Sequence, residues 1–200
     1  MVILLLLGLL QLAVPGLAQS PPAGAVKITA FKYSGTGCPP GSAEGVISFD
    51  GQTLTIIFSK YTVFTPGSPA DRRKNCQVTV ALEYPSGFTF TLATVTYGGL
   101  YAQLEPGVTG TLAAAYYFSG IPETARSKRE LLPPLEGNFE FTDKFATVVY
   151  QACGVQPAII NLFFEASVKP PPGSKAVGLI TVGSQDLRLK QIYRFIWKKC

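Results

Sequence analysis

Histidine is absent from all 200 residues of the sequence. This absence excludes serine–histidine–aspartate and cysteine–histidine catalysis, and it excludes zinc, copper and iron sites that use imidazole ligands. The four cysteines form no Cys-x-x-Cys pair, so a zinc site would need ligands from four distant parts of the chain. No glycine-rich loop precedes a predicted helix, which argues against the usual phosphate-binding loop. We therefore predict no metal and no cofactor.

Charged residues are also scarce, at 14% of the chain, and the formal net charge is +5. Lys and Arg are scattered, apart from two short clusters at 71–74 and 126–129, so the sequence lacks the signature of a nucleic-acid-binding protein. We interpret the first cluster as a solvated loop in preference to a contact with a polyanion. No Asn-x-Ser/Thr motif occurs, and N-glycosylation is therefore not expected.

Long apolar runs are confined to the first 14 residues, which are too few for a comfortable membrane span of about 20 residues. Pro15-Gly16-Leu17-Ala18 then places small residues where a signal peptidase cuts. We predict a signal peptide over residues 1–18, a loose leader over 19–24 and one domain over 25–200. The alternative is an uncleaved anchor, because the first residues carry no Lys or Arg. The mature chain is expected to be secreted, without a membrane span.

Alternating apolar and polar residues dominate the rest of the chain. From Cys76 to Tyr84 the larger apolar side chains fall at every second position, which is the period of a β-strand with one buried face. Pro85-Ser86-Gly87 supplies a turn, the alternation resumes at Phe88, and Asp50-Gly51 marks another hairpin. About ten such strands, without a convincing amphipathic helix, predict an all-β fold: a two-layer antiparallel β-sandwich or a jelly-roll-like barrel.

Two segments depart from this simple alternation. The apolar phase slips by one residue after Leu92, where we predict a β-bulge or bend, and Gly98-Gly99 is expected to end that strand. Residues 120–134 are interpreted as a long polar insertion. Within it, Lys128 and Arg129 form a dibasic pair that a processing protease of the secretory pathway could recognise in an exposed loop. The alternative is an ordinary solvated loop.

The strand pattern also predicts the core. The residues expected to be almost fully buried are Phe58, Val78, Val80, Leu82 and Phe90. Those expected on the more exposed side are Gln77, Thr79 and Glu83.

Aromatic residues are plentiful, at 12% of the chain, and most of the 13 Phe residues are expected in the core. The tyrosines Tyr97, Tyr101, Tyr116 and Tyr117 suggest a stacking platform for sugar rings. The alternative is that these tyrosines pack into the domain with their hydroxyl groups at its rim.

Two carboxyl groups suffice for glycoside hydrolysis, so composition leaves this reaction open. No motif surrounds the candidate carboxylates, and most of them should face solvent on strands or turns. The candidates are Asp50, Asp71, Asp143, Asp186, Glu83, Glu105, Glu140 and Glu165.

All four cysteines, Cys38, Cys76, Cys153 and Cys200, remain in the predicted mature chain. An even number of cysteines in a secreted protein favours two disulfides. Three pairings are possible. Chain entropy gives about 4 kcal/mol for each local loop, but a crossed pairing would gain about as much, so this argument leaves the pairing open.

Several short strings occur in the order of a known family. They are Gly37-Cys38-Pro39-Pro40-Gly41-Ser42, Leu54-Thr55-Ile56-Ile57-Phe58-Ser59-Lys60-Tyr61, Arg73-Lys74-Asn75-Cys76-Gln77, Tyr84-Pro85-Ser86-Gly87-Phe88, Tyr116-Tyr117-Phe118-Ser119-Gly120, Cys153-Gly154 and Trp197-Lys198-Lys199-Cys200. Over residues 37–200 the chain resembles a family of small secreted four-cysteine proteins, found largely in filamentous fungi and known only as a domain of unknown function. Residues 97–107 depart from the family pattern.

The resemblance implies secretion, a β-rich domain and no established activity. Together with locality along the chain, it favours the disulfides Cys38–Cys76 and Cys153–Cys200. We therefore predict a secreted, non-enzymatic protein that binds an extracellular glycan or cell-surface component, or serves as a structural factor. The alternative is an extracellular carbohydrate-active hydrolase, which would need two carboxyl groups about 5–10 Å apart across a cleft.

Overall fold

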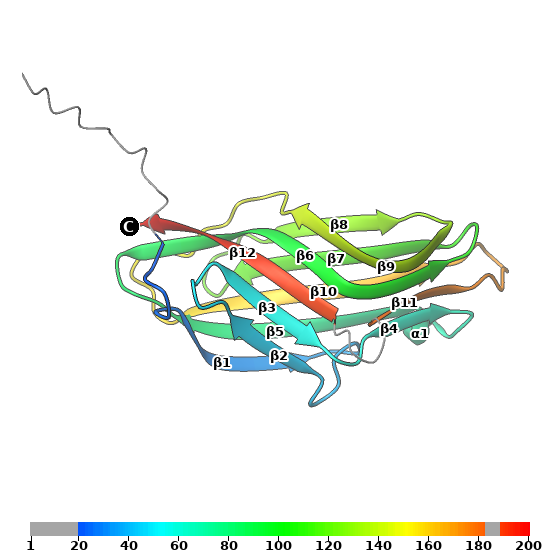
Figure 1. The fold of residues 1–200 in the computed structure, drawn as a ribbon, viewed down its shortest axis with the longest axis horizontal. Helices are drawn as coiled ribbons and strands as arrows, with labels where there is room; N and C mark the ends of the chain where they lie inside the picture. The colour runs from blue at the N-terminus through cyan, green and yellow to red at the C-terminus, as the bar shows by residue number, and fades with distance from the viewer. Residues whose placement is uncertain (1–19, 183–188) are drawn as a thin grey trace, which may run out of the picture.

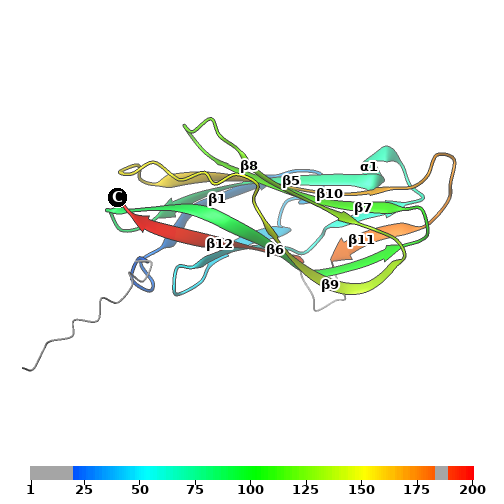
Figure 2. The same cartoon turned by 90° about the horizontal axis from the view of Figure 1, so that it is seen from above.

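The structure is a computed structural model, and it describes residues 20–182 and 189–200. In these ranges twelve strands form two antiparallel sheets, which pack face to face as the layers of a β-sandwich (Figures 1 and 2). The predicted all-β sandwich is confirmed, with two strands more than expected. The predicted signal peptide, residues 1–18, lies outside the described residues, as does Asp186 among the candidate carboxylates.

One layer is a five-stranded sheet in the spatial order β1, β5, β10, β7 and β8, in which all neighbouring strands are antiparallel. Its strands are β1 (Lys27–Ser34), β5 (Arg73–Glu83), β7 (Thr109–Phe118), β8 (Ala125–Leu131) and β10 (Ala158–Lys169). β10 is the middle strand, so both of its edges are hydrogen-bonded to neighbours.

The other layer has seven strands. Six of them follow the order β2, β3, β12, β6, β11 and β4. The seventh, β9, pairs with the edge of β6 that does not face β12 and β11. Its strands are β2 (Ala43–Ile47), β3 (Thr53–Phe58), β4 (Thr62–Thr65), β6 (Phe88–Leu104), β9 (Leu135–Lys144), β11 (Gly178–Val182) and β12 (Leu189–Lys199). A four-residue helix, α1 (Pro69–Arg72), precedes β5 in the segment expected to be a polar loop. No helix in the described ranges is long and apolar enough to cross a membrane.

Side chains alternate between the core and the outside along the strands, as the two-residue period of a strand requires. The predicted core residues are each no more than 2% exposed: Phe58, Val78, Val80, Leu82 and Phe90. The residues predicted for the other side are exposed or half-buried: Gln77, Thr79 and Glu83. The predicted facing of β5 is therefore confirmed.

β6 contains the predicted bulge. Its register with β12 skips Ala93, which lies between Leu92 and Thr94. The predicted end of the strand at Gly98-Gly99 is wrong, because β6 continues to Leu104 after a second shift of register opposite β9. Gly99 has a φ of 73°, a conformation that side chains other than glycine rarely adopt, so the strand bends here and then continues.

The interpretation of residues 120–134 as a polar insertion is also wrong. β8 lies within this segment and pairs with β7 along the edge of the five-stranded sheet. Ala125, Ser127 and Leu131 are its buried side chains, and charged residues stand between them. The chain then crosses to the other sheet through Pro133-Pro134 and enters β9. Charged edge strands resist pairing with other molecules, and the same charges conceal the strand pattern in the sequence.

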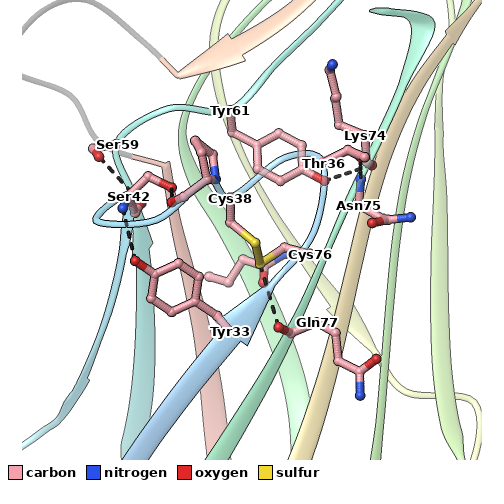
Figure 3. The surroundings of a disulfide bond; sticks show 12 residues. Tyr33, Thr36, Cys38, Ser42, Ser59, Tyr61, Lys74, Asn75, Cys76 and Gln77 are labelled. Carbon is pink, nitrogen blue, oxygen red and sulfur yellow. Dashed lines mark hydrogen bonds between the residues drawn. A yellow bond between two sulfur atoms is a disulfide. The ribbon is translucent and has the colours of Figure 1, made fainter. Parts of the chain in front are cut away.

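The two disulfides pair as expected. Cys38 bonds to Cys76 and Cys153 to Cys200, with Cα–Cα distances of 5.6 and 5.8 Å. The first bond ties the loop after β1 to the beginning of β5 (Figure 3). Beside it, the Tyr61 hydroxyl donates a hydrogen bond to the carbonyl oxygen of residue 74 at 2.8 Å. The second bond ties the C-terminus to the loop before β10.

Residues 20–24, which belong to the expected loose leader, lie against the β2–β3 hairpin. Pro21 is buried, and the Gly24 amide donates a hydrogen bond to the Phe49 carbonyl oxygen at 2.7 Å. The hairpin turns at Asp50-Gly51 as predicted, with a φ of 66° at the glycine. The described part of the leader is thus held against the sandwich.

Replacing Leu82 by alanine is expected to lower the free energy of unfolding by about 2–5 kcal/mol, because the change removes a fully buried side chain and leaves a cavity. The matched control is Glu83→Gln at the next, exposed position, which should change this free energy by less than about 0.5 kcal/mol. Urea denaturation measures both variants. A loss below about 1 kcal/mol for Leu82→Ala would show that the side chain is not packed in the core.

Stability should fall at alkaline pH. Burial raises the pKa of the Tyr61, Tyr97 and Tyr193 hydroxyls well above the ordinary value of about 10. Above that pH the unfolded chain releases these protons while the folded chain keeps them, so the free energy of unfolding decreases by up to about 1.4 kcal/mol per pH unit for each tyrosine. Urea denaturation at about pH 8 and about pH 11 measures this loss. Equal stability at both values would contradict the burial of these hydroxyls.

Candidate functional site

The four tyrosines predicted to form one stacking platform lie apart, so that prediction is wrong. Tyr97 and Tyr116 are fully buried between the sheets, where the Tyr116 hydroxyl donates a hydrogen bond to the Leu92 carbonyl oxygen at 3.0 Å. Tyr101 lies in β6 and Tyr117 in β7, and both are partly exposed. Because these two strands belong to opposite layers, their outward side chains face away from each other.

The dibasic pair lies in a strand, so the premise of the processing hypothesis, an exposed loop, is wrong. The Arg129 guanidinium binds both carboxylate oxygens of Asp143 in β9, with an Nε–Oδ2 distance of 3.0 Å. It also lies 4.5 Å from the centre of the Phe141 ring. Arg129 therefore joins the edges of the two sheets, and a protease could reach the bond after it only if β8 detached from β7.

Two of the candidate carboxylates stabilise turns. Asp50 accepts hydrogen bonds from the Ser48 hydroxyl and the Gln52 amide, and Asp71 accepts from the hydroxyl and amide of Ser68 at the beginning of α1. These hydrogen bonds lower the pKa of both carboxyl groups. A general acid needs a raised pKa, so these two residues fit that role poorly.

Two further candidates are partly buried and bound by arginines: Asp143, as described above, and Glu165, whose Oε2 lies 2.7 Å from Nη2 of Arg73. They belong to different layers, and each has its own cationic partner. Glu105 accepts a hydrogen bond from the Val177 amide at 2.6 Å. The remaining described candidates are exposed: Glu83 and Glu140.

A shallow depression lies on the outer face of the five-stranded sheet. It is lined by residues 113–115 of β7, all alanines, by Phe163 of β10, by residues 126–128 of β8 and by Ala146. Its volume is about 400 Å³. Alanine side chains are short, so β7 forms a low floor between the longer side chains of its two neighbours. We call this surface the alanine depression.

Strand register determines which side chains border the alanine depression. One outward row across the sheet consists of Phe163, Ala115 and Arg126. The next row consists of Glu165, Ala113 and Lys128. Each alanine therefore has a long basic side chain directly across from it on β8, and a larger side chain of β10 on its other side.

Polar side chains form the row beyond Phe163. The Thr79 hydroxyl donates a hydrogen bond to Oδ1 of Asn161 at 2.9 Å, and Nδ2 of Asn161 donates to the Ser119 hydroxyl at 3.0 Å. Tyr117 lies directly across from Asn161 and is 37% exposed. It is thus a diagonal neighbour of Phe163 on the same face, at about 7–8 Å between Cα atoms. This face combines two accessible rings with fixed hydrogen-bonding groups.

The comparisons with known proteins identify the family but no ligand. The family model described as Domain of unknown function (DUF4360) matches residues 24–200. The chain belongs to this family. A relative from Arthroderma benhamiae, described as an uncharacterized secreted protein, is 34% identical over 189 residues, covering 92% of this chain and 76% of the relative.

Among solved structures, TmCBM61 in complex with β-1,4-galactotriose matches with a TM-score of 0.32 and 11% identity. The match covers 86% of this chain and 90% of that chain. An overlap this loose carries no information about the ligand of the DUF4360 protein.

Sequence reasoning missed the residues around the alanine depression. A signal was present for Phe163, because the alternation over 160–168 places this ring among the polar residues Asn161 and Glu165. The alanines of β7 gave no comparable signal in the sequence. They form a depression only because the strands on either side of β7 carry longer side chains. The strand order and register supply that information.

We expect the chain to stay intact at β8, because Arg129 is held by Asp143 and the strand is paired with β7. Intact mass measured on secreted protein should show no chain that begins at Glu130. The Asp143→Asn variant removes the charge that binds Arg129 and should be cut faster at this position by a Lys-Arg-specific protease. Recovery of a chain beginning at Glu130 from the unmodified protein would contradict the description of β8 as a stable edge strand.

Proposed function

We propose that this DUF4360 protein is a secreted, non-enzymatic binding protein that holds an extracellular glycan on the outer face of its five-stranded sheet. The observation that carries the proposal is the alanine depression beside Phe163 and Tyr117. Sugar rings present apolar C–H faces and polar hydroxyl edges, so they suit a surface that combines aromatic rings with hydrogen-bonding side chains. The N-terminal signal pattern and a relative described as secreted support the extracellular location.

The sheet supplies a rigid support for such a surface. β10 and β7 are each paired on both edges, so their side chains need little ordering when a ligand binds. Asn161 is 7% exposed, and its hydrogen bonds to Thr79 and Ser119 fix the orientation of its amide. A sheet face held rigid in this way favours the recognition of a ligand with a stiff ring structure.

The competing proposal, a carbohydrate-active hydrolase, has less support. Hydrogen bonds lower the pKa of Asp50 and Asp71, and arginines bind Asp143 and Glu165. Glycoside hydrolysis needs one carboxyl group with a raised pKa as the general acid. The two proposals differ in one direct observation, which is whether bound glycan is cleaved.

A glycan array probed with the mature protein should identify bound glycans, and Phe163→Ala or Tyr117→Ala should weaken binding about tenfold through loss of ring contact. Tyr101→Ala is the matched control, because this tyrosine is partly exposed on the other layer. Titration calorimetry measures the affinities, and thermal unfolding checks that the variants are folded.

Three results would contradict the proposal. They are no binding to any glycan, equal loss of affinity in the Tyr101→Ala control, and unchanged affinity in both ring variants. Release of new reducing ends from a bound glycan would support the hydrolase instead.

A further inference from the structure

We infer that the preferred ligand of the alanine depression is an anionic glycan, one that carries carboxylate or sulfate groups. This inference rests on the proposed function and adds the chemical class of the glycan. It is carried by Arg126 and Lys128, two exposed cations that lie directly across from the two outward alanines of β7.

No side chain of β7 blocks either cation from reaching over the depression. Arg126 pairs in register with Ala115 and Lys128 with Ala113, so no bulky side chain of β7 stands beside either one. Residues two apart on a strand face the same way and lie about 7 Å apart. Two charges at this spacing, along one wall of a groove, can contact charged groups on successive sugar rings.

The positive charge of this wall is only partly neutralised by its neighbours. Arg126 forms no ion pair within the described ranges. Lys128 lies 3.2 Å from Glu130, but both side chains are more than half exposed, and such surface pairs contribute little. The carboxylate across the depression, Glu165, is already bound to Arg73 at 2.7 Å. An anionic ligand would therefore meet two available cations and no uncompensated carboxylate facing it from β10.

An anionic glycan fits this surface better than another polyanion does. Phe163 and Tyr117 lie beside the cations on the same face, and these rings can contact the apolar face of a sugar. Nucleic-acid binding requires a broad basic surface, whereas the other basic residues of this chain are scattered. The recognition chemistry is thus a pair of cations for the acid groups and two rings for the sugar faces.

The test compares four probes of similar chain length: polygalacturonate with carboxylates, dextran sulfate with sulfates, neutral dextran, and single-stranded DNA. The mature protein should bind at least one of the two acidic glycans at least tenfold more tightly than dextran or DNA. The R126Q/K128Q variant should lose at least tenfold in affinity for that glycan. It should also lose most of the salt dependence, because the screened charges are gone. The carboxylate and sulfate probes show which anion is preferred.

The matched control is K190Q/R194Q, which removes one Lys and one Arg from exposed positions on the outside of β12. It should keep the affinity of the unmodified protein. Equal losses in both double variants would overturn the inference, because net charge alone would then explain binding. DNA binding as tight as glycan binding would also overturn it. Tight binding of a neutral glycan that depends on Phe163 but not on Arg126 and Lys128 would overturn the inference and leave the proposed function standing.

Discussion

An edge-to-face contact between Phe90 and Phe118 joins the two layers. Phe90 lies on β6 of one sheet and Phe118 on β7 of the other, with ring centres 5.3 Å apart and planes at 83°. Phe195 and Trp197 of β12 lie against Phe90 at 5.1 and 4.9 Å. Edge-to-face packing of buried rings contributes more than their burial alone, so this cluster strongly favours one arrangement of the sheets.

This arrangement also determines what β7 shows to solvent. A strand offers alternate residues to its two faces, and a slip of one residue would turn every side chain over. With Tyr116 and Phe118 fixed in the core, Ala115 and Tyr117 must lie on the outer face. The alanine depression is therefore a consequence of how the core packs. A change that loosens the core should disturb the depression even where it touches none of its residues.

The sequence allowed much of the fold to be predicted, since the alternation from Cys76 to Tyr84 directly reports a strand with one buried face. The phase slip after Leu92 likewise located a real bulge. β8 was missed because its edge position favours charged residues, and these removed the apolar alternation on which the prediction relied.

The candidate site was much harder to predict, because it depends on which strands are neighbours. The four candidate tyrosines all lie in strands of similar composition. Whether each ring is buried or exposed depends only on whether its position alternates in step with the core residues of that strand. Arg126 borders the alanine depression only because Ala115, eleven residues earlier in the chain, lies directly across from it on β7. Such relations arise from sheet pairing, which a single sequence does not report.

An NMR titration tests most directly whether the outer face of the five-stranded sheet is the binding surface. It uses the nitrogen-15-labelled mature protein and short oligosaccharides of whichever acidic glycan, polygalacturonate or dextran sulfate, binds more tightly. We predict that amide shift changes concentrate in β7, β8 and the middle of β10, around Phe163. The amides of β3 and β12, on the opposite layer, should stay unchanged. Shift changes centred on the seven-stranded sheet, or the absence of any change with either acidic glycan, would contradict this account.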